Sequence, residues 1–455
     1  DDCCHVGSDC PVCVKGNASF PVRWRKNVFE LSDVEMTSLL DALHAMKVTS
    51  NEDGKLLYGP AFRSYDYFVV KHLAAYLDVR GDAGHRSTAF LNFHSLFVLE
   101  FENALLAVEP SLTGCPYWDW RESDAARTDL FVPGLFGSAP GSGAEGTVTD
   151  AGFGTWNIAE MNSSIFDAKW RHLLTNESML DWDGSTDTGY LRGNVGGPAA
   201  NPLLVRFGTL NDTTTREESD CFDYNASFPF SAFHDNCIST IHSTPHRNLG
   251  GDRGDEGGDF KNPASSPNDP IFMFHHANLD RLKLHWMSVQ EDSEAYYYSF
   301  PIQGITFTAN GGVDELHYQY WGLNEIITEN FGYTDADMGI DIHGSANASL
   351  WTHADAICQL NPDNVPYVYS SQLAETFTPT LAPTAPSFAP TFAPTFAPSE
   401  MPSTAPTTSL RPTAAPVDGT DDATDDGRVV VGLAARKHAA DFGSIALLSL
   451  IVLLM

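Results

Sequence analysis

The segment NDPIFMFHHANLDRLKLHW, residues 268–286, is predicted to form a helix in apolar surroundings. Asn268 and Asp269 are both residue types that cap helix N-termini, and Pro270 suits the first turn, where its missing N–H group has no partner to lose. The helix that follows carries the adjacent pair His275 and His276 among Ile, Phe, Met and Leu. A histidine in such surroundings loses its hydration, so its ring nitrogens need other partners.

Three more segments are predicted to be helices. One opens with Ser32 and Glu35 at the spacing of a capping box. Behind that cap, apolar residues recur at helical spacing: Leu31, Met36, Leu39, Leu40, Leu43 and Met46. Residues 64–78 (SYDYFVVKHLAAYLD) and 88–108 (TAFLNFHSLFVLEFENALLAV) have the length of helices and few helix-breaking residues. By contrast, residues 130–235 are rich in Gly, Asp, Asn and Ser with little periodicity, which predicts long loops.

Six of the sixteen histidines fall into two groups of three. The groups are His72, His85 and His94, and His242, His246 and His276. His242 and His246 are four residues apart, so on one helix their rings share a face. Metal coordination would give these apolar histidines a partner, and neutral imidazole suits copper, zinc, iron and nickel. No Cys or carboxylate accompanies either group at matching spacing, which favours paired copper over structural zinc, although the spacing alone leaves the metal open.

Four segments resemble motifs of the tyrosinase family. They are GHRSTAFLNFHSLFVLEFENAL (84–105), CPYWDW (115–120), HSTPHRNLGG (242–251) and NDPIFMFHHANLDRL (268–282). The first resembles the family's first copper motif at His85, Phe90, Phe93, His94 and Glu102. The last resembles the second copper motif at Asp269, Pro270, Phe272, His276 and Asp280. The likeness runs in order from about Val22 to Asp280, and more weakly through NFGYTDAD (330–337).

The resemblance implies a mainly α fold, with a four-helix-bundle core that holds a dicopper site, long loops and a few short strands. It implies that each group of three histidines binds one of two copper ions: His72, His85 and His94 the first, and His242, His246 and His276 the second. His275 is then expected to lie beside the site without binding metal. O2 is the implied co-substrate.

The implied reaction is the oxidation of o-diphenols to o-quinones by a tyrosinase or catechol oxidase, with hydroxylation of monophenols such as tyrosine as a second activity. Melanin or polyphenol formation uses this chemistry, and the substrates are small phenols or accessible tyrosines. Two alternatives stay open. The related haemocyanins bind O2 reversibly at such a site, and a copper domain can also be catalytically silent within a surface glycoprotein. The six intact histidines argue against the silent form, and a single site on a stalk makes a poor bulk carrier.

Three positions depart from the family pattern, and a fourth is a candidate at the entrance to the site. Ser95 stands where the first motif commonly has Arg, which we interpret as the loss of one helix-surface contact. In members that hydroxylate monophenols well, an Asn and a Glu hold a water, and Ser243 and, by a rough alignment, His234 take their places here. His234 is a candidate base because histidine ordinarily titrates near neutral pH, and a plain surface histidine is the alternative. Arg247 is a candidate for steering acidic substrates at the entrance, or for a structural ion pair.

Composition limits the classes of partner. The chain is 42% hydrophobic and 11% aromatic, which excludes disorder throughout. Its 26 basic and 59 acidic residues leave a net charge of −33, which argues against nucleic acid and against charge-driven docking to anionic lipid. The first residue is Asp1 rather than Met, so we expect that a signal peptide has been removed.

Cysteines and glycosylation sequons indicate the secretory pathway. Eight cysteines fit disulfides. Cys221 with Cys237 is the preferred pair, while Cys3, Cys4, Cys10 and Cys13 are expected to form disulfides rather than a zinc knuckle with His5. Asn-X-Ser/Thr sequons predict glycosylation at Asn17, Asn162, Asn176, Asn211, Asn225 and Asn347.

Five segments are predicted along the chain. They are a Cys-rich segment (1–20), the dicopper domain (21–373), a Pro/Thr/Ser-rich stalk (374–417), an acidic spacer (418–442) and a hydrophobic tail (443–455). The stalk repeats Phe-Ala-Pro-Thr/Ser, which favours polyproline II and O-glycosylation; a ligand for proline-binding domains is the alternative. The tail has 13 residues, fewer than the ~20 that cross a bilayer. It resembles a glycolipid-anchor signal, with a membrane-inserted tail as the alternative, so we expect a secreted or cell-surface protein.

Overall fold

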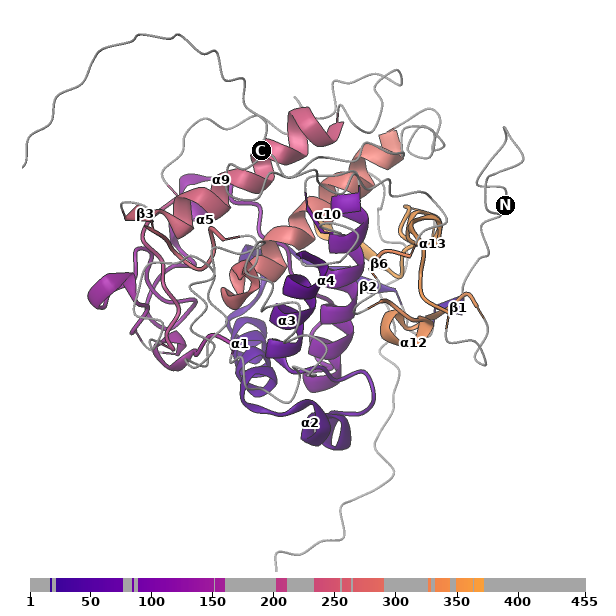
Figure 1. The fold of residues 1–455 in the computed structure, drawn as a ribbon, viewed down its shortest axis with the longest axis horizontal. Helices are drawn as coiled ribbons and strands as arrows, with labels where there is room; N and C mark the ends of the chain where they lie inside the picture. The colour runs from indigo at the N-terminus through magenta and orange to yellow at the C-terminus, as the bar shows by residue number, and fades with distance from the viewer. Residues whose placement is uncertain are drawn as a thin grey trace, which may run out of the picture. The chain divides into compact units, whose positions relative to one another are not determined.

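Helices dominate the computed structural model of this chain (Figure 1). It describes residues 17–18, 22–76, 84–85, 89–150, 152–159, 202–210, 233–253, 256–262, 265–289, 326–328, 332–343, 349–362 and 364–371. All of these lie in the first of two compact units, within Asp1–Phe377. The predicted stalk, spacer and tail lie outside the described residues, as do Cys221 and the sequons after Asn17.

Four helices form the centre of the domain. They are α3 (Tyr65–Tyr76), α4 (Ala89–Val108), α9 (Ser239–Gly250) and α10 (Ile271–Val289). In Figure 1, α4 and α10 lie side by side in the middle of the molecule, and α9 packs on α10. Helix α3 meets α10 where the rings of His72 and Phe272 lie 5.0 Å apart. The prediction of a mainly α fold with a four-helix core is confirmed.

Helix α4 is the most deeply buried of these elements. Every residue from Ala89 to Leu105 is buried, so the helix has no solvent-facing side over that length. This explains why its sequence is apolar throughout instead of amphipathic, since a helix that is hydrophobic all round belongs in the interior. Its polar exceptions, His94 and Glu102 among them, therefore need partners inside the protein.

Helix α1 (Asp33–Val48) covers the bundle and begins as predicted. The side chain of Ser32 accepts a hydrogen bond from the backbone N–H of Glu35, and the Glu35 carboxylate accepts one from the N–H of Ser32 at 2.9 Å. The apolar stripe behind this capping box faces α3 and α4, with Leu39, Leu43 and Met46 buried. The short helix α2 (Asn51–Tyr58) follows.

The start of α10 is held by a buried ion pair. Of the two candidate caps, it is Asp269 whose carboxylate accepts from the backbone N–H of Ile271, at 3.2 Å, whereas Asn268 accepts from Ala159. Arg206 donates to both carboxylate oxygens of Asp269 at 2.6 and 2.8 Å, and both side chains are fully buried. Helix α10, which carries His276, is thus anchored to the segment 202–210.

The remaining elements are short. The helices are α5 (Asp124–Thr128), α12 (Asp335–Met338) and α13 (His353–Gln359), with 3-10 turns η1 (Val28–Glu30), η2 (Ala144–Gly146), η3 (Phe153–Thr155) and η5 (Ser266–Asn268), and a π-helical turn η4 (His234–Ile238). The strands are β1 (Asn17–Ala18), β2 (Arg23–Arg25), β3 (Asp252–Arg253), β4 (Glu256–Gly257), β5 (Ile340–Asp341) and β6 (Tyr367–Tyr369). Strands β1 and β5, and β3 and β4, pair antiparallel, whereas β2 and β6 pair parallel. The predicted few short strands are confirmed.

The structure corrects the interpretation of Ser95 and gives the state of three cysteines. Ser95 is only 1% exposed, so the interpretation of a lost helix-surface contact is wrong: α4 has no surface at that position. Cys237 and Cys358 are both disulfide-bonded, and Cys115 is a buried free thiol. Pairing of Cys237 with Cys221 stays a prediction, because Cys221 lies outside the described residues. No described helix has both the length and the apolarity needed to cross a membrane.

Candidate metal centre

The structure brings each predicted histidine group together. The ligand atoms of His72 on α3, His85 before α4 and His94 on α4 all lie within 4.8 Å of one another. Those of His242 and His246 on α9 and of His275 and His276 on α10 form a second cluster within the same limit. Because the two clusters come from four helices of one core, their spacing depends on how those helices pack.

Hydrogen bonds to backbone carbonyls orient one ring of each cluster. His94 Nδ1 lies 2.9 Å from the carbonyl oxygen of Phe90, and His246 Nδ1 lies 2.7 Å from that of Phe260. A carbonyl oxygen only accepts, so both rings carry their proton on Nδ1 and leave the Nε2 lone pair free. Nε2 of His246 is buried and has no hydrogen-bond partner among the described residues. This is how metal-binding histidines are usually oriented.

The nitrogen positions fit a metal ion. Nε2 of His72 and Nε2 of His94 lie 3.3 Å apart. Two imidazole nitrogens that each lie ~2.0 Å from one ion in tetrahedral geometry are separated by about 3.3 Å. In the second cluster, both ring nitrogens of His276 are buried and have no partner within the described part of the chain. A buried polar atom without a partner is costly, and an ion at each cluster would remove that cost.

The two clusters face each other in an apolar compartment. The rings of His94 and His276 stack at 4.1 Å and 17°, one from each cluster. Phe90 lies 4.5 Å from His94 and 4.6 Å from His242, and Phe272 lies 4.1 Å from His276. These aromatic walls keep water away from the space that the rings enclose.

Burial keeps these imidazoles neutral. Loss of hydration, followed by the proximity of other histidines, holds the pKa well below its usual range in His72, His94, His242 and His276. For His246 desolvation again dominates and lowers the pKa to about 4. Only the neutral ring has a lone pair for a metal, so at neutral pH the site is ready to bind one.

The segment that carries both clusters matches a known family. A family model described as the common central domain of tyrosinase matches residues 62–289, half of the chain, and that range contains both clusters. This chain belongs to the tyrosinase family. Members are dicopper enzymes that use O2, and the two histidine clusters fit two copper sites.

Individual relatives are more distant. The chain is similar to tyrosinase of Streptomyces lincolnensis, 31% identical over 233 residues that cover 49% of this chain and 72% of that protein. It is similar to tyrosinase of Streptomyces antibioticus, 29% identical over 280 residues, 58% of this chain and 82% of the other. Among solved structures, a variant polyphenol oxidase from Thermothelomyces thermophila has a TM-score of 0.46 at 21% identity, covering 76% of this chain and 88% of that one.

His275 lies within the second cluster, next to His242. Its ring is parallel to that of His242, at 5.8 Å and 7°, and its Nε2 lies 3.2 Å from the carbonyl oxygen of His242. The carbonyl can only accept, so the proton of His275 is on Nε2. This contact joins α10 to α9 at a ligand-bearing residue, which is a positioning role.

Three other predicted residues lie around His242, which is partly exposed. The ring of His234 on η4 lies 5.7 Å from Phe90, which itself contacts His242. Ser243 accepts a hydrogen bond from Nη2 of Arg247 at 3.1 Å, and Arg247 is exposed. The structure therefore gathers all three on the α9 side of the clusters, and Arg247 contacts a hydroxyl there.

Phe260 is a contributor that no sequence pattern reveals. Besides accepting from His246, it stacks its ring on that imidazole at 4.2 Å. It follows a glycine-rich turn that packs on the end of α9: a Cβ at Gly258 would lie 2.5 Å from the carbonyl oxygen of Gly250. The glycines were a signal of close backbone approach, but nothing in their spacing points to His246.

Proposed function

We propose that this member of the tyrosinase family oxidises o-diphenols to o-quinones faster than it hydroxylates monophenols. Copper-dependent oxidation of phenols with O2 is the activity of its family, and the chain is a tyrosinase-type oxidoreductase. The observation that carries the oxidation itself is the pair of neutral histidine clusters that face each other through His94 and His276; the slower hydroxylation rests on Ser243 and His234.

Six histidines hold the copper in this proposal. His72, His85 and His94 bind one ion, and His242, His246 and His276 bind the other. When bound, the two ions supply the redox chemistry, taking up O2 and accepting the two electrons of the diphenol. The protein contributes neutral ligands in fixed orientation, through the carbonyls of Phe90 and Phe260, and an apolar compartment lined by Phe90 and Phe272.

Substrate reaches the site on the α9 side. His242 is the partly exposed member of the six histidines, whereas the other five are buried. A small phenol that approaches there meets Phe90 on one side and the pair Ser243 and Arg247 on the other. The substrates are therefore small phenols, and a tyrosine on a protein must protrude to enter.

The balance between the two activities depends on a proton. A diphenol needs only access to the two ions, whereas a monophenol must first be deprotonated by a positioned base. Ser243 already accepts a hydrogen bond from Arg247, and His234, the nearby candidate base, lies 5.7 Å from Phe90. Neither offers a carboxylate, so monophenol hydroxylation is the slower activity.

Oxygen uptake with paired substrates tests the proposal. Purified protein with two coppers per chain should consume O2 rapidly with a catechol and slowly, after a lag, with the matching monophenol. Reversible O2 binding without quinone release would instead identify an oxygen carrier, as in haemocyanins. Neither binding nor turnover by copper-loaded protein would identify a silent glycoprotein.

The location of the protein is a separate proposal. The six sequons, the even number of cysteines and the anchor-like tail support a glycosylated protein of the secretory pathway, either secreted or held at the cell surface. A shift in electrophoretic mobility after glycosidase treatment tests the glycosylation. Release from membranes by a phosphatidylinositol-specific phospholipase separates a glycolipid anchor from a membrane-inserted tail.

A further inference from the structure

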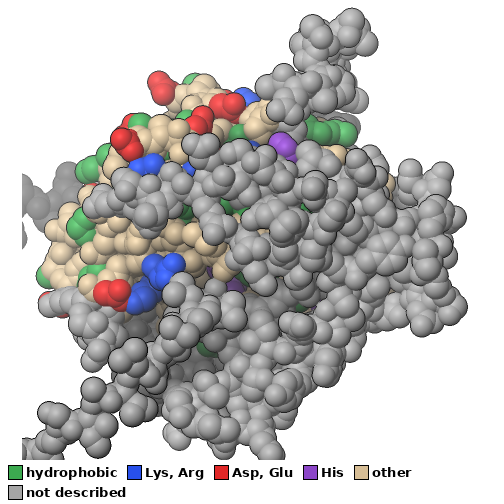
Figure 2. All heavy atoms as spheres, turned by 90° about the horizontal axis from the view of Figure 1, so that it is seen from above, with side chains coloured by type: hydrophobic (Ala, Val, Ile, Leu, Met, Phe, Trp, Pro, Cys, Tyr) green, Lys and Arg blue, Asp and Glu red, His purple; other side chains and the backbone are tan. Residues whose placement is uncertain are grey.

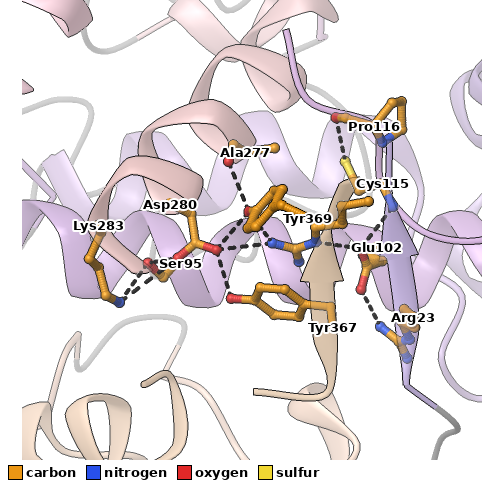
Figure 3. Close-up of polar contacts among 11 residues, drawn as sticks. Arg23, Ser95, Glu102, Cys115, Pro116, Ala277, Asp280, Lys283, Tyr367 and Tyr369 are labelled. Carbon is orange, nitrogen blue, oxygen red and sulfur yellow. Dashed lines mark hydrogen bonds and ion pairs between the residues drawn. The ribbon is translucent and has the colours of Figure 1, made fainter. Parts of the chain in front are cut away.

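A buried polar cluster joins the two central helices next to the histidines (Figure 3). Ser95 directly follows His94 on α4, and Asp280 lies one helical turn after His276 on α10. Asp280 is 1% exposed and Ser95 equally so, which places both inside the core. The cluster therefore joins the two helices next to the third histidine of each triplet.

Lys283 completes this connection. Its Nζ donates to Ser95 Oγ at 2.9 Å and lies 3.8 Å from Oδ1 of Asp280, and Ser95 Oγ donates to that same carboxylate oxygen at 2.5 Å. The ammonium group is fully buried. Figure 3 shows the three side chains in contact between α10 and α4. A buried ammonium is unfavourable unless it is paired and hydrogen-bonded, and here both conditions are met.

The second oxygen of Asp280 is committed elsewhere. Oδ2 accepts from the hydroxyls of Tyr367 and Tyr369 on β6, at 2.7 and 2.8 Å, and from Arg25 on β2 at 3.1 Å. Arg25 also donates to Glu102 on α4 at 2.6 Å. Oδ2 of Asp280 thus contacts the paired strands β2 and β6. Oδ1 contacts Ser95 on α4 and Lys283 on α10, so it lies where the two helices meet directly.

Position 95 explains why this lysine matters. The tyrosinase-like motif commonly has Arg there, and an arginine on α4 would bring its own cation to Asp280. Serine supplies a hydroxyl but no charge, and Arg25 meets the other oxygen, Oδ2, so a cation beside Oδ1 must come from another element. Lys283 supplies it from α10 itself, three residues after Asp280. Burial lowers the pKa of Lys283 to about 8, against the stabilising charge of Asp280, so the ammonium stays protonated at neutral pH.

We infer that Lys283 is a positioning residue that takes over the cation missing at Ser95 and fixes how α4 sits along α10. Because His94 and His276 lie on those helices next to this contact, it would set the distance between two copper ions held by the two clusters. The inference rests on the proposed ligation by six histidines. Lys283 touches neither copper ligand, so it acts through Ser95 and Asp280.

Three variants of the full chain test this role. Lys283→Met keeps the length of the side chain and removes the charge. The exchange Ser95→Lys with Lys283→Ser returns the cation to α4 and keeps it next to Asp280. Lys47→Met is the matched control, because it removes an ion pair to Asp66 that joins α1 to α3 and carries no link between α4 and α10.

The measurements are copper per chain and magnetic coupling. Two Cu(II) ions close enough to share a bridging ligand give no signal in electron paramagnetic resonance, so the visible fraction reports their separation. We expect little visible copper in the wild type, a several-fold larger visible fraction in Lys283→Met, and a return toward the wild type in the exchange variant. Lys47→Met should lower the melting temperature with the visible fraction unchanged.

The outcomes separate the two proposals. A wild type that does not bind two coppers contradicts the ligation itself. A wild type with two coupled coppers and a Lys283→Met variant with the same coupling overturns the role of Lys283. If Lys283→Met does not fold, the exchange variant decides: wild-type coupling supports the role, and a folded, uncoupled exchange variant overturns it.

Discussion

At the scale of residues, the centre works because burial and backbone contacts set the state of each imidazole. The carbonyls of Phe90 and Phe260 hold the protons of His94 and His246 on Nδ1, which leaves Nε2 for the metal. Desolvation then makes the charged form unfavourable. The histidines are thus neutral and oriented before copper arrives, so binding requires little rearrangement.

Loss of single histidines is the first prediction. His94→Ala or His276→Ala should reduce copper from two to about one per chain and lower oxidation below ~1% of wild type, because both ions are needed for the two-electron reaction. His44→Ala is the control, since His44 packs on Phe153 and Trp156 outside both clusters. Metal analysis and oxygen uptake measure this. Full activity in either cluster variant would contradict the ligand assignment.

The second prediction concerns how the stability of the copper-free protein depends on pH. Unfolded histidine has a pKa of ~6.5, and that of folded His246 is about 4. The unfolded state therefore binds more protons between these values, so stability is fully present above pH 6.5 and is lost as pH falls toward 4. His246 alone contributes about 3 kcal/mol to this loss. Urea unfolding at pH 7 and pH 5 checks it, and equal midpoints would contradict buried neutral histidines.

Ser243 provides the third prediction. Ser243→Asn adds an amide next to His242, able to hold a water for deprotonation, and frees Arg247 from the serine hydroxyl. The ratio of monophenol to diphenol turnover should rise by roughly tenfold, part of the ~10²–10⁴ that a positioned base contributes. Parallel oxygen-uptake assays measure the ratio. A wild type that already hydroxylates monophenols as fast as it oxidises catechols would show that the base is misplaced.

At the scale of elements, two of the four ligand-bearing helices, α10 and α4, are fixed by buried ion pairs from outside the bundle. Helix α10 is held at its start by Arg206 on Asp269 and in its middle by Arg25 on Asp280. Helix α4 is held by the same Arg25 through Glu102. These buried pairs link segments far apart in the chain, so they determine which way the helices pack more than how stable each one is.

Arg206 gives the fourth prediction. Arg206→Met leaves the Asp269 carboxylate buried without its cation, which should cost ~3–5 kcal/mol and loosen the first turn of α10, close to His275 and His276. Thermal unfolding and copper content measure the effect. Ser32→Ala is a matched control: it should cost only ~1 kcal/mol and leave copper content unchanged, because α1 carries no ligand. Equal effects of the two variants on stability and copper content would show that the ion pair of Arg206 and Asp269 does not position α10.

At the scale of the whole molecule, two strands from opposite ends of the described domain pair with each other. Strand β2 pairs with β6, which brings Arg23 opposite Tyr367 and Arg25 opposite Tyr369. The ring of Tyr367 lies 3.4 Å from the Arg25 guanidinium, so the pairing is fixed by side chains as well as by the backbone hydrogen bonds between the strands.

On the described part of the face in Figure 2, apolar, acidic and basic side chains are mixed over the surface.

Truncation is the fifth prediction. A chain that ends at Leu373 keeps β6 and every described element, so it should fold, bind copper and be released into the medium with its activity retained. A chain that ends at Val365 loses the hydroxyls of Tyr367 and Tyr369 from Asp280 and should fail to fold. Activity assays on the secreted fractions compare them. An inactive but folded longer truncation would show that the tail belongs to the catalytic domain.

Local order in this protein could be predicted from its sequence. The cap at Ser32, the helix behind Pro270 and the shared face of His242 and His246 all depend on neighbours within four residues, and such spacing is written directly in the chain. The two copper motifs could be recognised for the same reason, since each lies mostly on one helix.

Only the tertiary structure decided the contacts between elements. Periodicity predicts a surface position for Ser95, because it cannot show that α4 is buried on every side. The hydrogen bond between His246 and the carbonyl of Phe260 joins residues 14 positions apart. The one from Lys283 to Ser95 spans 188 positions, and the one from Arg25 on β2 to Tyr369 on β6 spans 344. Such partners are selected by the packing of the whole chain, which leaves no regular spacing in the sequence.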